Sequence, residues 1–361
     1  MHDFNLSFWQ PKKDQCDDCK AYKNAEDKSL LQETYDEHLK QKTLARAEKD
    51  RDKELVSNTF VVAVYDLQAV MPRPRGADVS SFYYTSKLNL FNFIITELGT
   101  KDTTCFVWHE GEGARGINEI GSCVLMYLRK LNDNATEPCD VTFYSDNCCG
   151  QQKNKFMLAM YQYVTQELLN IKSITHKFLI KGHTQNEGDC VHSVIQRNIT
   201  RALKSSPIYV PDQYITLIKT AKKTGKPYTV KELTYENFFD LKPLCTGNYN
   251  TDDDGNRFKW TDIKILKVDK VSNGIFFFKT SYEEAEFRSV STLRKRRTKS
   301  KAVPDNNLTL NQLYTEKLTI PEAKKQGILK LIQKKTSCQD FMNLFMLISK
   351  LVHKLLLGTD F

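Results

Sequence analysis

The chain has 361 residues, a formal net charge of +9, 40% hydrophobic residues and ten cysteines. This length and apolar content allow one large domain with a smaller one, and the composition is that of a globular protein. The cysteines are too sparse for a small secreted disulfide domain, which favours a reducing compartment. The positive charge favours an acidic partner, of which nucleic acid is the commonest, although it also serves solubility.

The N-terminal segment, residues 1–57, is predicted to contain a Cys/His motif and a charged helical arm. In KKDQCDDCK, Cys16 and Cys19 have the spacing of half a zinc site, and His38 follows 19 residues later. A fourth ligand would be His2 or a residue upstream of this chain; a reduced pair without metal is the alternative. The arm, residues 28–54, has 14 charged residues in 27 and no Gly or Pro, which predicts a long solvated helix.

Residues 58–240 are predicted to form an α/β core. Strand patterns occur in NTFVVAVYDLQAV, SSFYYTSKLNL and TTCFVWHE. Beyond them we expect a helix at 117–131, a strand at 141–145, a helix at about 151–170, a strand at 174–180 and a helix at about 189–203. Three strands followed by alternating helices and strands give an α/β order.

Residues 241–361 are predicted to form a small extension. Asn273-Gly274 lies between two β-rich runs, which is typical of a hairpin. Helices are expected from Asn307 onwards. The most apolar stretch, residues 341–358, is interrupted by polar and charged residues, so it predicts an amphipathic helix and no membrane span.

A basic run, RKRRTKSK at 294–301, begins with Arg294, Lys295, Arg296 and Arg297. These cations are expected to contact nucleic-acid phosphates. The same pattern is typical of a nuclear-import signal and of a solvated linker. We therefore expect a nuclear protein, or otherwise a cytoplasmic one.

Three glycines in CFVWHEGEGARGINEI, residues 105–120, have the spacing of a dinucleotide-binding loop. Two glutamates in this loop would repel a pyrophosphate. The next strand-end acid, Asp146, also lies 146 − 116 = 30 residues beyond the last glycine, instead of about 20. We therefore predict a tight strand-to-helix connection that directs Glu119 towards a site, with the dinucleotide loop as the alternative.

Carboxylates recur where predicted strands end and helices begin. Since such ends can converge at one edge of a sheet, these acids could hold two divalent ions on a phosphodiester. The candidates are Asp66, Glu119, Asp146, and the His183, Glu187 and Asp189 of KGHTQNEGD.

In VVAVYD, GINEIGSCVLMYL, TFYSDNCCGQQ and IKGHTQNEGD, the chain resembles ribonuclease H and the transposase-integrase superfamily. The sequences of these motifs also resemble those of a family of uncharacterised ribonuclease-H-like domains, a domain-of-unknown-function group of transposon origin. The resemblance covers about residues 10–205 and implies a mixed five-stranded sheet with flanking helices.

The resemblance also implies roles for these side chains. Asp66 would bridge two Mg²⁺ ions, Glu119 and Asp146 would complete one of them, and Asp189 would hold the other. His183 would shuttle a proton or ease product release. The implied activity is metal-dependent phosphodiester hydrolysis or strand transfer on DNA.

The last acid stays open between two residues. Helical periodicity puts Glu187 on the apolar stripe of its helix if the helix already includes it. The family pattern, with an acid six residues after the histidine (189 − 183 = 6), favours Asp189.

The rival interpretation is a domesticated protein that binds nucleic acid or another protein and no longer cuts. Carboxylates close enough to share two ions about 4 Å apart would favour the enzyme, and dispersed carboxylates would favour the rival.

Overall fold

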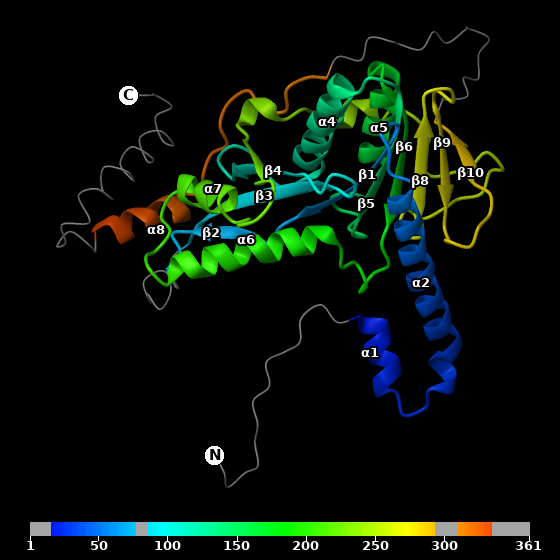
Figure 1. The fold of residues 1–361 in the computed structure, drawn as a ribbon, viewed down its shortest axis with the longest axis horizontal. Helices are drawn as coiled ribbons and strands as arrows, with labels where there is room; N and C mark the ends of the chain where they lie inside the picture. The colour runs from blue at the N-terminus through cyan, green and yellow to red at the C-terminus, as the bar shows by residue number, and fades with distance from the viewer. Residues whose placement is uncertain (1–15, 77–85, 293–309, 334–361) are drawn as a thin grey trace.

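The computed structural model describes residues 16–76, 86–292 and 310–333 (Figure 1). His2, the basic run at 294–301 and the segment 341–358 lie outside the described residues. Within the described residues, no helix is long and apolar enough to cross a membrane.

Helices and strands alternate through the core much as the sequence predicts. The helices are α1 (Asp17–Asn24), α2 (Gln32–Glu54), α4 (Ile117–Asn134), α5 (Lys155–Glu167), α6 (Glu187–Leu203), α7 (Pro211–Lys219) and α8 (Glu322–Gln333). The strands are β1 (Phe60–Leu67), β2 (Met71–Arg73), β3 (Leu88–Glu97), β4 (Thr103–His109), β5 (Cys139–Ser145), β6 (Ile171–Phe178), β7 (Thr229–Glu232), β8 (Ile265–Asp269), β9 (Ile275–Lys279) and β10 (Arg288–Ser291). The hairpin predicted at Asn273-Gly274 is the β8–β9 connection.

One mixed sheet has ten strands in the described part of the chain, in the order β10-β9-β8-β6-β5-β1-β3-β4-β7, with β2 paired to β3. In its centre, β3 lies antiparallel to β1 and β4, whereas β5 lies parallel to β1 and β6. The five-stranded sheet expected from the sequence is too small. Because unpaired edge strands expose backbone donors and acceptors, β7 and β8 pair with the two edges and extend the sheet.

The second central strand lies further along the chain than predicted. β3 begins at Leu88, near the end of SSFYYTSKLNL, and continues to Glu97. Residues 90–96 are buried without alternation, because helices cover both faces of the sheet here. The period-2 pattern that marks a half-buried strand is therefore absent from this segment.

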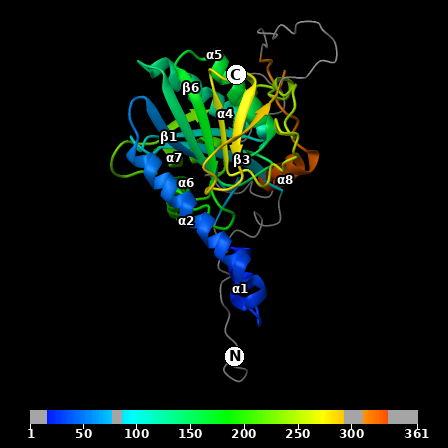
Figure 2. The ribbon, with the colours of Figure 1, turned by 90° about the vertical axis from the view of Figure 1, so that its right-hand side faces the viewer.

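Helices cover both faces of the sheet (Figures 1 and 2). α4 and α5 lie on one face, while α6 and α7 lie on the other. Side chains of β1 alternate between two clusters: Ala63 and Tyr65 join the larger core, and Val62 and Val64 pack with Tyr144. Asp66 follows this alternation onto the second face, the face that α6 covers.

The charged arm is anchored at one end and projects at the other. α2 projects from the sheet, and α1 folds back beside it (Figures 1 and 2). At the anchored end, Lys177 of β6 contacts Asp52 at 2.5 Å and Glu48 at 2.6 Å. The hydroxyl of Tyr144 donates to Asp52 at 2.6 Å. The helix predicted at residues 28–54 corresponds to α2, which begins at Gln32. The short helix α1, before it in the chain, was not predicted.

Candidate functional site

Three side chains meet where β1 ends and α6 begins. Asp66, Asp189 and His192 each offer one ligand atom, and these atoms lie within 4.8 Å of one another. Nδ1 of His192 lies 3.6 Å from Oδ2 of Asp66. Asp189 is exposed and the other two are half-buried, so the group opens to solvent on one side.

A small residue lets α6 come this close to β1. A Cβ built on Gly188 would lie 3.2 Å from the Cβ of Asp66, closer than most side chains allow. The side chain of Asn186 accepts from the Gly188 N–H at 2.7 Å, and Asp189 in turn accepts from the Asn186 N–H at 2.8 Å. This capping box fixes the first turn of α6, and with it the backbone that carries Asp189.

Asp146 follows β5, the parallel neighbour of β1. Its Oδ1 accepts from the Cys148 N–H at 3.2 Å, and the Oδ1 of Asp66 likewise accepts from the Leu67 N–H at 2.8 Å. Asp146 lies outside the 4.8 Å group, yet its charge reaches Asp66. One oxygen of each carboxylate is thus held by the backbone, which orients the other.

The electrostatics show that the acids are crowded together. Burial, and next the charges of Asp146 and Asp189, raise the pKa of Asp66 to about 7. Burial is also the main cause that raises the pKa of Asp146, and the charge of Asp189 adds to it. Negative charges held this close favour a cation between them. Carboxylate oxygens suit Mg²⁺ or Mn²⁺, and the imidazole nitrogen favours the transition metal of the two.

His192 is the site residue that the sequence reasoning missed. Its Nε2 is buried and has no hydrogen-bond partner in the described residues. Burial lowers the pKa of His192 to about 4, so the imidazole is neutral at pH 7 and can coordinate a metal. The available signal was the spacing: His192 follows Asp189 by three residues, which puts both on one face of a helix.

Glu119 does not join these acids. Its Oε2 accepts from the Gly116 N–H at 2.8 Å and so caps the start of α4. Its Oε1 accepts from the hydroxyl of Tyr314, which comes from the C-terminal segment. Glu119 therefore serves the glycine connection and not the Asp66 group.

The glycine connection is covered by protein, which contradicts the dinucleotide alternative. The N–H groups of Glu112 and Gly113 both donate to the carbonyl of His109, at 2.8 Å and 3.2 Å. A Cβ on Gly113 would lie 2.6 Å from Phe238. Lys324 is ion-paired with Glu110 at 2.6 Å. Backbone groups that a pyrophosphate would need are thus used within the chain, and the glycines allow tight packing.

The two candidates for the last acid point in different directions. Both lie in the first turn of α6, which begins at Glu187. Asp189 belongs to the group with Asp66, whereas Glu187 is ion-paired with Lys49 of α2. Helical periodicity favoured Glu187, whereas the family pattern favoured Asp189, and Asp189 is the one that lies with Asp66.

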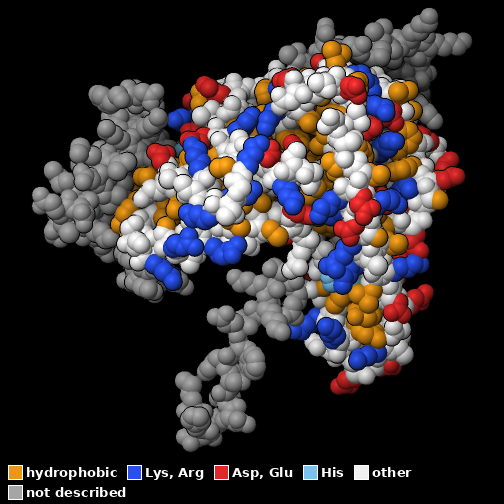
Figure 3. Space-filling view, viewed as in Figure 1, with side chains coloured by type: hydrophobic (Ala, Val, Ile, Leu, Met, Phe, Trp, Pro, Cys, Tyr) orange, Lys and Arg blue, Asp and Glu red, His pale blue; other side chains and the backbone are white. Residues whose placement is uncertain are grey.

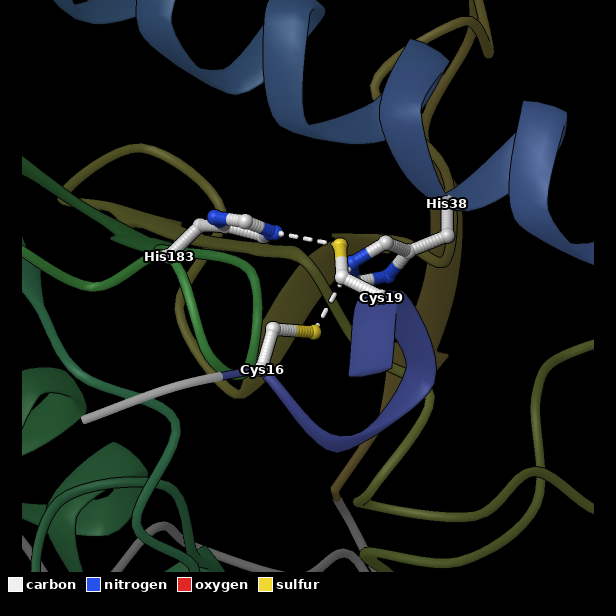
Figure 4. Close-up of side chains that lie close together, drawn as sticks. All are labelled: Cys16, Cys19, His38 and His183. Atoms are coloured by element: carbon white, nitrogen blue, oxygen red, sulfur yellow. Dashed lines mark hydrogen bonds between the residues drawn. The ribbon is translucent and has the colours of Figure 1, made fainter. Parts of the chain in front are cut away.

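A second cluster contains the predicted zinc ligands and a histidine expected elsewhere. Cys16, Cys19, His38 and His183 offer ligand atoms that all lie within 4.8 Å of one another. Figure 4 shows the cysteines at the start of α1, His38 on α2 and His183 on the loop between β6 and α6, all pointing to one centre. His183 thus lies with the cysteines and not among the acids.

The loop after Asp146 is held by a buried lysine. Lys153 is fully buried, and its Nζ donates to Oδ1 of Asn147 and to the carbonyl of Thr261, both at 2.7 Å. Burial lowers its pKa to about 8. The ammonium group of Lys153 therefore holds the conformation of the motif DNCCGQQKN through these two hydrogen bonds.

Replacing Lys153 with methionine is expected to destabilise the fold by about 1–3 kcal/mol, because two acceptors lose a donor that lies in the interior. Urea unfolding measures the change. The matched control is Lys155→Met, because Lys155 is exposed and its loss should cost less than about 0.5 kcal/mol. Equal effects of the two substitutions would contradict this role.

A family described as Domain of unknown function (DUF7869) matches residues 87–259. Over this segment, the resemblance to an uncharacterised domain-of-unknown-function family is confirmed. The segment includes Asp146, Asp189, His192 and His183, whereas Asp66 and the two cysteines precede it. No curated protein and no solved structure matches the chain.

Proposed function

We propose that this protein is a transposase-derived, nuclease-like enzyme that cleaves or transfers DNA phosphodiester bonds with a divalent metal ion. The observation that carries the proposal is the grouping of Asp66, Asp189 and His192 with Asp146 close by. These residues come from β1, from α6 and from the end of β5, so the fold has to be formed before they meet.

The strand arrangement supports a ribonuclease-H-like core. The order β4-β3-β1-β5-β6, with the first three strands antiparallel and the last two parallel to β1, is the arrangement expected for that fold. In this arrangement β1 and β5 are neighbours, so the acids that follow them lie at the same edge. The remaining strands are additions at the two edges of this core.

Asp66, Asp189 and His192 would hold one Mg²⁺, and Asp146 with Asp66 would hold a second. Metal ions bound there would neutralise phosphate charge and lower the pKa of a bound water. The chain itself orients one carboxylate oxygen each of Asp66 and Asp146 through backbone N–H groups. The first turn of α6 holds Asp189 through its capping box.

A row of cations on α6 supports a polyanionic substrate. Arg197, Arg201 and the C-cap residue Lys204 are exposed, share one face of α6, and come after Asp189 along the helix. Lys and Arg side chains gather over this part of α6 (Figure 3). From Asp189 to Lys204 the row extends for about 22 Å at 1.5 Å per residue. A phosphate backbone along this row would lead into the acidic group.

Replacing Arg197, Arg201 and Lys204 together with glutamine is expected to flatten the salt dependence of duplex DNA binding. Each lost phosphate contact removes about 0.9 from the log–log slope, so three contacts remove up to about 2.7. The control replaces three exposed lysines on other elements, Lys53, Lys130 and Lys259, and thus changes the net charge equally. Similar slopes for both variants would contradict a track on α6.

The proposed function is tested with the full chain and labelled single-stranded DNA, duplex DNA and RNA. We expect cleavage of DNA with Mg²⁺ or Mn²⁺ and none with a chelator. Asp146→Asn should abolish cleavage while largely sparing binding, because the substitution keeps the side-chain size and removes the charge. Binding without cleavage under all these conditions would overturn the proposal and favour a domesticated binding protein.

A further inference from the structure

We propose that Cys16, Cys19, His38 and His183 bind one zinc ion, and that this ion ties the N-terminal arm to the loop that leads into Asp189. This site is separate from the acidic group and stands without the proposed nuclease function. It combines three segments that are far apart in the sequence: α1, α2 and the β6–α6 loop (Figure 4).

The donor set and its dimensions fit a tetrahedral zinc ion. Two thiolates and two imidazoles are a common structural set, with Zn–S bonds of about 2.3 Å and Zn–N bonds of about 2.0 Å. Tetrahedral geometry then separates sulfur and nitrogen ligands by about 3.5 Å. Here Cys16 Sγ lies 3.2 Å from Nε2 of His38, and Cys19 Sγ lies 3.3 Å from Nε2 of His183. The ligand atoms are therefore already at nearly the required spacing.

Groups around the ligands hold their orientation. The second ring nitrogen of His38, Nδ1, lies 3.8 Å from a carboxylate oxygen of Asp18. A carboxylate behind a ligating imidazole is typical of zinc sites, because it fixes the ring and the tautomer. The Sγ of Cys16 lies 3.8 Å from the carbonyl of Lys181, next to the loop that carries His183.

The β6–α6 loop is shaped for close contact with Cys16. Gly182 has a φ of +77°, a conformation that favours glycine. A Cβ at Gly182 would lie 2.5 Å from the Cβ of Cys16, so any larger residue would push the loop away. The His183 N–H donates to the carbonyl of Ile180 at 2.8 Å and closes the turn. The glycine thus brings His183 within reach of both cysteines.

Among the described residues, the ion pair that joins α1 to the β6–α6 loop, between Asp17 and Lys181 at 3.7 Å, is solvent-exposed and therefore weak. This helix has eight residues and no buried side chain, and an isolated helix of that length is unstable in water. Tyr22 stacks on Tyr35 of α2 at 3.8 Å, which holds α1 to the arm but not to the sheet. A zinc ion would supply the missing free energy, because binding to a site that forms only in the folded state stabilises that state.

The site also bears on the position of Asp189. His183 precedes Asp189 by six residues, and the capping residue Asn186 lies between them. A second tie from the arm, the ion pair between Lys49 and Glu187, holds the same turn. Zinc would thus fix one end of a short loop whose other end carries a member of the acidic group.

Zinc content and cobalt spectra of the full chain test this proposal. We expect one zinc per chain after purification, and Co²⁺ in its place should give the visible bands of a tetrahedral ion with thiolate charge transfer. Cys19→Ser should halve the charge-transfer intensity. His183→Gln should weaken zinc binding about a hundredfold or more.

The matched control is His2→Gln, since His2 is the fourth ligand that the sequence alone suggested. It should leave zinc content and affinity unchanged. Limited proteolysis after zinc removal should cut the α1–α2 turn while the sheet resists, because Lys177 anchors the C-terminal half of α2 without zinc. Unchanged affinity in His183→Gln, or wild-type protein without a tetrahedral cobalt spectrum, would overturn the proposal. If His183→Gln does not fold, the wild-type spectrum and Cys19→Ser still decide.

Discussion

Replacing Asp66 with asparagine is expected to lower the rate of DNA cleavage about a thousandfold, which corresponds to about 4 kcal/mol of transition-state stabilisation. Asp66 shares a group with Asp189 and His192, and the charge of Asp146 helps to raise its pKa. Asparagine keeps the size and one oxygen but removes the charge that would hold metal ions. Single-turnover cleavage with Mg²⁺, compared with DNA affinity, measures the effect.

The matched control for Asp66→Asn is Asp140→Asn, since Asp140 lies at the opposite end of the neighbouring strand β5 and contacts Ser173 at 2.5 Å. It should change the rate by less than a few-fold. Glu119→Gln separates the geometry from the sequence-based expectation: its carboxylate caps α4, so its effect should fall on stability and not on the rate. A thousandfold loss in Glu119→Gln would contradict the described arrangement.

Replacing Lys177 with methionine is expected to destabilise the protein by about 3–5 kcal/mol, because it leaves the buried carboxylate of Asp52 without its cation. Asp52 has an exposed fraction of 4%, and Lys177 contacts both Asp52 and Glu48. The hydroxyl of Tyr144 alone cannot balance the charge of Asp52. Denaturant unfolding measures the loss, and proteolysis of α2 should show that the arm detaches.

The control for Lys177→Met is Lys219→Met. Lys219 forms an ion pair with Glu232 at 3.3 Å, and both side chains are about half exposed. An exposed pair contributes only about 0–1 kcal/mol, so this substitution should change the unfolding free energy little. If both substitutions cost the same, the arm is not anchored by the buried pair.

The sequence by itself determined the order of the core elements. Apolar runs and helical periodicity mark the segments that become β1, β4, α4, β5 and α6, because burial of one face imposes a period on each element. It also placed Asp66 at the end of a strand and Asp146 just after one, and it predicted that Cys16 and Cys19 form half of a zinc site. These features depend on residues close together in the chain.

Only the tertiary structure decided which distant residues meet. His183 and Cys19 are 164 residues apart in the chain, and no local pattern indicates that a loop after β6 approaches α1. The resemblance suggested that His183 serves the acids, but the turn at Gly182 directs it to the cysteines. His183 could therefore be identified as the fourth candidate ligand only from the folded structure.

The same reason explains the changes in the acidic group. Glu119 has the position of a site residue, but the same position in the first turn of α4 lets it accept from the Gly116 N–H, and Tyr314 donates to its second oxygen. Glu187 and Asp189 both carry a carboxylate in the first turn of α6. Glu187 pairs with Lys49, whereas Asp189 lies with Asp66. His192 lies in the group with Asp66 because α6 packs closely on β1 at Gly188. Local sequence sets which side chains are available, and long-range packing selects among them, because side-chain contacts form between elements and not within them.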